Sequence, residues 1–109
     1  MSTLWRVRLA SRAEQDFFKI VQWSADNFGR QQAAEYAETL SLAIGALADG
    51  PDVLGAKCRS ELGDGIMTIP VSRGGRKGRH FAVFGVGGET TIDVLRLLHD
   101  SMDLVRHVS

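Results

Sequence analysis

Apolar and charged residues alternate at the start of the chain. Over residues 4–10, Arg6 and Arg8 each stand between two apolar residues. A period of two is typical of a strand with one buried face and one face in solvent. The pattern therefore predicts an N-terminal strand whose arginines lie on the solvent side.

Two segments with helical periodicity follow this strand. The first begins at Ser11, and Glu14 stands three residues later, so we expect a capping box in which the Ser11 side chain caps the helix. Its apolar residues recur every three or four positions and share one face, and Gly29 is expected to end it. A second helix is predicted from about Arg30 to the Asp-Gly-Pro-Asp sequence at 49–52. Because the link is so short, the helices should form an antiparallel hairpin.

The second half of the chain is typical of strands. After a less regular stretch at 52–65, apolar runs occupy residues 66–71, 80–84 and 91–98. A Gly-Gly-Glu sequence at 87–89 separates the last two runs and is a strong hairpin signal.

These elements predict an α+β fold. We expect an N-terminal strand, an antiparallel helical hairpin and then a three-stranded antiparallel meander, all forming one sheet. Nothing in the composition divides the chain, so residues 1–109 are expected to be a single domain.

Composition narrows the function classes. The formal net charge is zero, which does not favour a strongly basic nucleic-acid binder. Cys58 is the one cysteine, so neither an internal disulfide nor a multi-cysteine zinc cluster is expected. No apolar run approaches the roughly 18 residues of a membrane span, and no signal peptide is recognisable. The expected location is the cytoplasm.

Positive charge is concentrated in one glycine-rich segment, residues 73–79. Its basic residues are Arg73, Arg76, Lys77 and Arg79. Glycine allows close backbone approach to a partner, and arginine offers a planar fork for phosphate or carboxylate. The segment is therefore a candidate binding loop for nucleic acid or an acidic protein surface. The alternative is a solvated hairpin loop with no such role.

A second candidate lies near the end of the last predicted strand. By alternation, Arg96 falls on the same face as Ile92 and Val94, where a charged residue requires a partner or an opening. His99 follows and is able to act as an acid or base near neutral pH. The alternative is that Arg96 pairs with Asp103 to fix the C-terminal tail.

Two further observations concern partners and metals. Phe18 and Trp23 lie off the apolar stripe of the first helix, so they either contact a partner helix or segment or fill a second buried face. The three histidines lack the spacing of metal ligands on a helix, so no metal or other cofactor is expected.

Four segments in order resemble the RelE/ParE toxin superfamily, and most closely its ParE branch. The first, RVRLASRAEQDFFKIVQWSADNFG, has the Ala-x-x-Asp and Phe-Gly pattern, with Ala13 and Asp16. The second is AAEYAETLSLAIGALADGPDVLG and the third is GRHFAVFGV. The fourth, VLRLLHDSMD, is similar to the ParE ending, with Arg96, Leu98, His99 and Asp103 at the matching positions.

The resemblance implies the toxin of a type II toxin-antitoxin system. Such a toxin inhibits growth by binding DNA gyrase without catalysis, takes part in plasmid stabilisation, and is neutralised in a hetero-oligomer with a ParD-like, often ribbon-helix-helix, antitoxin. Leu98 and Asp103 are then structural, and Phe18 and Trp23 are the expected antitoxin contacts. The expected target-binding residues are Arg73, Arg76, Lys77, Arg79, Arg96 and His99.

Two alternatives stay open. RelE members cleave messenger RNA on the ribosome, and His99 is a candidate acid or base for that reaction, with Arg79 and Arg96 stabilising the transition state. The absence of a tyrosine near the C-terminus weakens this reading, since Tyr36 on the second predicted helix is the only tyrosine. The other alternative is a relative that has lost toxicity and persists bound to an antitoxin.

Overall fold

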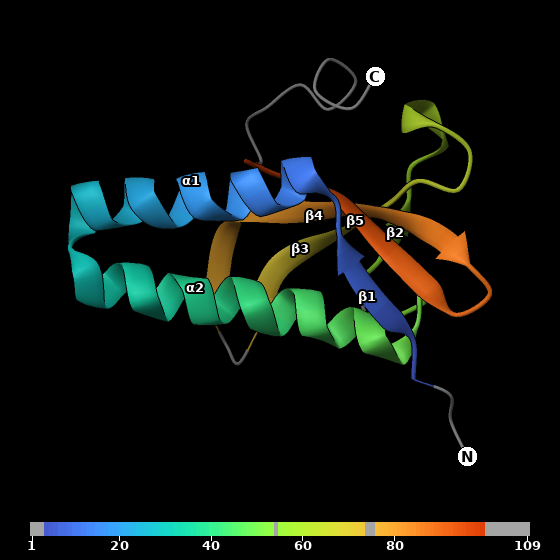
Figure 1. The fold of residues 1–109 in the computed structure, drawn as a ribbon, viewed down its shortest axis with the longest axis horizontal. Coiled ribbons are helices and arrows are strands. Elements are labelled where there is room, and N and C mark those ends of the chain that lie inside the picture. Colours follow the sequence, from blue (N-terminus) through green and yellow to red (C-terminus); the bar gives the residue numbers. More distant parts are fainter. Residues whose placement is uncertain (1–3, 54, 74–75, 100–109) are drawn as a thin grey trace.

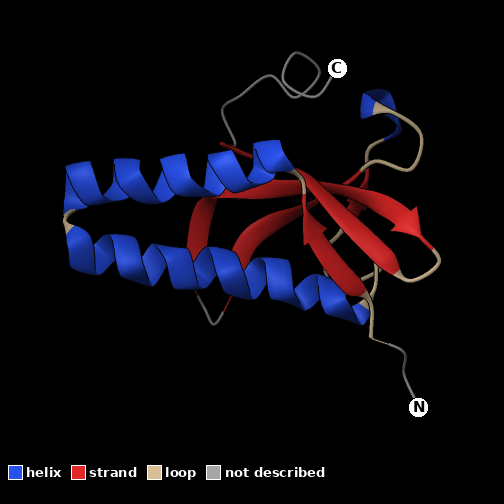
Figure 2. Ribbon diagram, viewed as in Figure 1, coloured by secondary structure: helices blue, strands red, loops and turns tan. Residues whose placement is uncertain are grey.

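The computed structural model describes residues 4–53, 55–73 and 76–99; for 72–73 and 76–79 it describes the backbone. A helical layer covers one face of a sheet (Figures 1 and 2). The elements in order are β1 (Arg6–Leu9), α1 (Ser11–Phe28), α2 (Arg30–Gly45), the 3-10 turn η1 (Ala46–Asp49), β2 (Lys57–Cys58), the 3-10 turn η2 (Ser60–Leu62), β3 (Met67–Arg73), β4 (Arg76–Gly88) and β5 (Thr91–His99).

The five strands form one mixed sheet in the order β1-β5-β4-β3-β2. The β3-β4-β5 meander is antiparallel, as predicted, and β2 pairs antiparallel with β3. The N-terminal strand β1 instead runs parallel to β5, with Val7 opposite Ile92. A parallel pair requires a long crossover connection between its strands, and the helical hairpin with the remaining strands supplies it. The α+β prediction is confirmed, with β2 as an additional short strand.

The two helices lie antiparallel, with α1 over β5 and α2 over β3 (Figure 1). Their linked ends project beyond the edge of the sheet. Gly29 forms the link at φ +94°, a value that favours glycine, and its N–H donates to the carbonyl of Ala25. The predicted end of the first helix is confirmed.

The predicted capping box at Ser11 is wrong. Ser11 is already helical, the cap position is Ala10, and no side chain caps the helix. The chain passes straight from β1 into α1, and the N–H of Ala10 donates to the carbonyl of Val94 in β5. The start of α1 is therefore fixed by the sheet rather than by a capping side chain.

The core lies between the helices and the sheet. Its larger cluster joins α1 and η1 to the three central strands, and a smaller one joins α2 to β3. The fully or almost fully buried members are Ala13, Leu47, Ile69, Ala82, Phe84, Ile92, Val94 and Leu97 in the first cluster and Leu40, Ala43 and Val71 in the second. Burial of a large apolar side chain contributes about 1.5–3 kcal/mol, so these contacts hold the helical layer on the sheet.

Helices long and apolar enough to cross a membrane do not occur in the described part of the chain.

Candidate functional site

An ion pair joins helix α1 to the part of strand β5 that lies beyond the end of β1. The Nε of Arg96 lies 2.7 Å from Oδ2 of Asp16, and its second nitrogen lies 3.1 Å from Oδ1. The side chains are only 14% and 13% exposed. The hydrogen bond to Asp16 raises the pKa of Arg96 above its ordinary value, even though partial burial acts in the opposite direction. The pair is thus a forked, charge-assisted contact that keeps Arg96 ionised.

The Asp16 carboxylate also serves the backbone of β5. Strand β1 ends at Leu9, which pairs with Val94, and within residues 4–53, 55–73 and 76–99 no strand pairs with the outer edge of β5 beyond that point. The N–H of Leu97 donates to Oδ2 of Asp16 at 3.0 Å. The carboxylate therefore takes the place of a missing strand at this edge.

The predicted face of Arg96 is wrong because β5 contains a bulge. Val83 of β4 pairs with Arg96 and the next residue, Phe84, pairs with Val94, so Leu95 is an extra residue. After the bulge the alternation is reversed, and Leu97 joins Ile92 and Val94 in the core. Arg96 is consequently directed to Asp16 at the sheet edge.

Three ionisable side chains come together at the end of the β4-β5 hairpin that is farthest from its turn. His80 pairs with His99 across the two strands, and their ring centres are 5.2 Å apart. The hydroxyl of Tyr36, on α2, lies 2.6 Å from Nδ1 of His80. All three side chains are half-buried. We call this group the Tyr36–His80–His99 cluster.

The basic segment 73–79 is a hairpin end rather than a loop. Arg73 ends β3 and pairs with Arg76, which begins β4, and Ser72 pairs with Lys77. The predicted loop is therefore wrong for all but residues 74 and 75, which lie outside the described residues. Because β4 continues from 76 through Arg79 into His80, the basic segment is continuous with the Tyr36–His80–His99 cluster.

Helix α1 carries two exposed aromatic residues that the sequence singled out. Phe18 is 71% exposed and Trp23 is 57% exposed, so the fold of the described chain does not bury them. The ring of Trp23 meets that of Phe28 edge to face, with centres 5.6 Å apart, near the projecting end of the hairpin.

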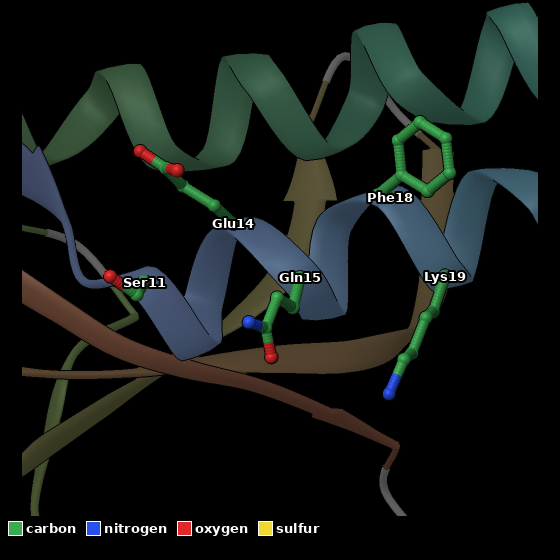
Figure 3. A pocket seen from close by; sticks show the side chains of 5 residues that line it. All are labelled: Ser11, Glu14, Gln15, Phe18 and Lys19. Carbon is green, nitrogen blue, oxygen red and sulfur yellow. The ribbon is translucent and has the colours of Figure 1, made fainter.

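A shallow depression of about 440 Å³ lies beside Phe18. It is lined by Ser11, Glu14, Gln15, Phe18 and Lys19. In Figure 3, Glu14 and Phe18 lie on the side of α1 nearer to α2, whereas Lys19 extends the other way. A depression lined by an apolar ring, a carboxylate and an ammonium group suits an amphipathic partner.

The predicted site residues thus occupy different places. Arg96 is bound to Asp16, His99 lies in the Tyr36–His80–His99 cluster, and Leu98 is buried. Asp103 lies outside the described residues, so its predicted pairing does too. The contacts of Asp16 with Arg96 and of Tyr36 with His80 were not predicted from the sequence. Asp16 itself was already noted there as the acidic residue of the Ala-x-x-Asp pattern.

Comparisons with known proteins agree with this architecture. The family model described as "ParE toxin of type II toxin-antitoxin system, parDE" matches residues 7–104. Toxin ParE1 of Mycobacterium tuberculosis is 32% identical over 103 residues, which cover 94% of this chain and 97% of that protein. Toxin ParE1 of Caulobacter vibrioides is 30% identical, with 93% and 95% covered.

Two solved structures share the fold. One is from the chromosomal ParDE toxin-antitoxin system of P. aeruginosa, with a TM-score of 0.73, 20% identity and coverage of 90% of this chain and 98% of that chain. The other is from the toxin-antitoxin complex RelBE2 of Mycobacterium tuberculosis, with a TM-score of 0.55, 24% identity and coverage of 88% and 98%. The family model and the relatives span almost the whole chain, and the chain belongs to the ParE toxin family of type II toxin-antitoxin systems.

Proposed function

We propose that the chain is a growth-inhibiting toxin that binds and poisons DNA gyrase and is neutralised by a ParD-like antitoxin. The observation that carries this proposal is family membership over residues 7–104, with relatives named toxin ParE1. The protein then acts in the cytoplasm, where gyrase meets chromosomal DNA, and needs no cofactor. Residues 1–109 act as a single domain in this proposal.

The basic hairpin end is the proposed contact with the gyrase–DNA complex. Its arginines and Lys77 stand at positions 73, 76, 77 and 79, on two paired strand ends. Guanidinium groups at a hairpin end suit phosphate or carboxylate surfaces, and such a contact needs no catalytic group. His99 lies next to this end and is the second proposed contact.

Arg96 has a different place in the proposal. Its guanidinium is held by Asp16 and is 14% exposed, so it supports the position of β5 more than it offers charge to a target. Arg96 therefore remains one of the proposed target-binding residues, and its proposed role is to shape the binding surface.

Controlled expression of the chain in bacterial cells tests this proposal. We expect growth arrest, trapped gyrase–DNA breaks and loss of supercoiling, with intact messenger RNA. Replacement of all four basic residues of segment 73–79 by glutamate should restore growth, because the contact surface changes sign. Growth arrest that persists in this variant would show that another surface meets the target.

A second candidate function is RNA cleavage, and the Tyr36–His80–His99 cluster is the observation that favours it. The imidazoles of His80 and His99, with ring centres 5.2 Å apart, are side chains of the kind that serve as general acid and base. The phenol that is missing near the C-terminus is supplied from α2, at 2.6 Å from His80. Cut messages with normal supercoiling, abolished by His99→Ala, would favour this candidate over gyrase. Expression without any growth inhibition would instead favour a relative that has lost toxicity.

A further inference from the structure

The end of β5 that carries His99 extends past the strand beside it. β1 pairs with β5 as far as Leu9, which lies opposite Val94. No other strand of the described chain lies on this edge of β5. On the opposite edge β4 continues to the end of β5, where His80 pairs with His99. The outer edge of this strand end therefore has to be held by something other than a strand.

Asp16 holds this edge at two successive residues. Its Oδ2 accepts the Nε–H of Arg96 at 2.7 Å and the backbone N–H of Leu97 at 3.0 Å, and its Oδ1 accepts the second guanidinium nitrogen at 3.1 Å. Helix α1 brings the carboxylate over β5 (Figure 1). One side chain thus ties both the backbone and a side chain of β5 to the helical layer.

The bond to Leu97 lies close to His99 along the strand. Two residues of a strand span roughly 7 Å, and backbone groups of alternate residues point to the same edge. His99 is therefore the next residue after Leu97 on the edge that Asp16 holds. Its half-buried ring faces that of His80, with ring centres 5.2 Å apart. A shift of the backbone at Leu97 would move the His99 ring relative to β4.

We propose that Asp16 is the positioning residue for the target-binding end of β5, and that its carboxylate sets where His99 lies beside the basic hairpin end. This inference rests on the proposed function, in which His99 is a target contact. Asp16 acts through β5, because its side chain is 13% exposed and its oxygens bind Arg96 and Leu97. A carboxylate suits this role, since its two oxygens can accept a guanidinium fork and a backbone N–H together.

A role in stability alone predicts a different result. The loss of toxicity would then follow the loss in free energy of unfolding, wherever in the fold the substitution is made. If Asp16 acts through His99, however, the losses caused by substitution of the two residues overlap and do not add. The coupling between Asp16 and His99 therefore separates positioning from stabilisation.

Growth inhibition by the full-length chain measures this coupling, with the amount of toxin per cell determined by immunoblot. Asp16→Ala and His99→Ala should each raise the amount that halves the growth rate roughly tenfold, as truncation of a strong interface contact does. The double variant should also need roughly tenfold more, rather than roughly a hundredfold. Asp16→Asn, which removes the charge and keeps an amide oxygen, replaces Asp16→Ala if that variant does not fold.

The matched control is Leu47→Ala, which truncates a fully buried side chain of η1 and destabilises the fold without touching Asp16 or His99. It should lose less toxicity than Asp16→Ala for a comparable loss of stability, and its effect should add to that of His99→Ala. Losses of Asp16→Ala and His99→Ala that add in the double variant would overturn the proposal.

Nuclear magnetic resonance of the full-length protein tests the placement without the target. In Asp16→Ala the amide of Leu97 should exchange faster and the His99 resonances should shift, whereas the part of β5 paired with β1 keeps its protection. Unshifted His99 resonances would overturn the proposal. Growth inhibition with unaffected gyrase would instead refute the gyrase target, and the coupling would still be measured. If the unchanged chain does not inhibit growth, the proposed function fails, and the resonances alone decide whether Asp16 positions His99.

Discussion

At the residue scale, one carboxylate holds two parts of the fold together. Asp16 accepts two bonds from the Arg96 guanidinium and one from the Leu97 backbone. A mostly buried ion pair of this kind is costly to break, because the remaining charged group stays shielded from water and no longer has an opposite charge beside it. In this chain, Asp16 thus binds a part of the β5 edge that β1 is too short to cover.

Asp16→Asn is expected to lower the free energy of unfolding by about 2–3 kcal/mol, since it removes charge from hydrogen bonds that stay mostly buried. Chemical denaturation measures this change. The matched control is Asp93→Asn, which affects the exposed ion pair of Asp93 with Arg8. Surface pairs contribute little, so the control should lose clearly less stability. Equal losses in the two variants would contradict the account.

The pH dependence of this pair follows from Arg96. Its pKa is raised in the folded state, so the contribution of the pair is complete below the ordinary arginine pKa. It is lost only as the pH rises through the raised value, far into the alkaline range. Deprotonation of Arg96 should therefore cause no change in stability from about pH 5 to 9.

At the element scale, the sequence patterns predicted each main helix and strand but not how strands are joined. Period-two and helical spacing depend on residues close together in the sequence. The helical hairpin, the meander and the end of the first helix at Gly29 could therefore be predicted. The bulge at Leu95 was not, because a bulge depends on the register between β4 and β5 rather than on residue type. The parallel β1-β5 pair and the His80–His99 pair likewise arise from contacts between distant segments.

Two glycines of β4 give a test of the outer face of the sheet. A Cβ on Gly87 would overlap the Asp93 carboxylate and press on Arg8, whereas the nearest atom to a Cβ on Gly85 would be a carbonyl oxygen at 3.5 Å. Gly87→Ala must therefore displace the Arg8–Asp93 pair. Because an exposed pair contributes at most about 1 kcal/mol, we expect the melting temperature to fall by no more than roughly 4–8 °C. Gly85→Ala, on the same strand face, should melt within 1–2 °C, or about the scatter of such measurements, of the unchanged protein. A larger loss for Gly85→Ala than for Gly87→Ala would refute this reading.

At the scale of the whole molecule, the helical and hairpin surfaces are separate, which suits separate partners. Exposed aromatic residues lie on α1, and the basic segment lies at the end of β3 and β4. An antitoxin on the helices would leave a distinct surface for the target, so neutralisation would then require the antitoxin to extend over the molecule or to block approach. This division is a proposal that two sets of variants can separate.

Phe18→Ala and Trp23→Ala are expected to weaken neutralisation by the cognate antitoxin, because truncation of an exposed aromatic residue at an interface commonly costs more than 1 kcal/mol. Cells that express the variant toxin with its antitoxin should then grow less well, while toxicity without antitoxin stays the same. The control is Leu42→Ala on α2, which removes a comparably exposed apolar side chain. If the antitoxin fully restores the growth of cells that express either aromatic variant, Phe18 and Trp23 lie outside the antitoxin interface.

The central claim is that this ParE family member acts on DNA gyrase, and a supercoiling assay with purified components tests it most directly. Gyrase, relaxed plasmid and ATP are mixed with the purified chain, with or without glutamate at the four basic positions of segment 73–79. The account predicts that the unchanged chain blocks supercoiling and accumulates cleaved plasmid, and that the charge-reversed chain does neither. Undiminished supercoiling at a large excess of the correctly folded, unchanged chain would contradict it.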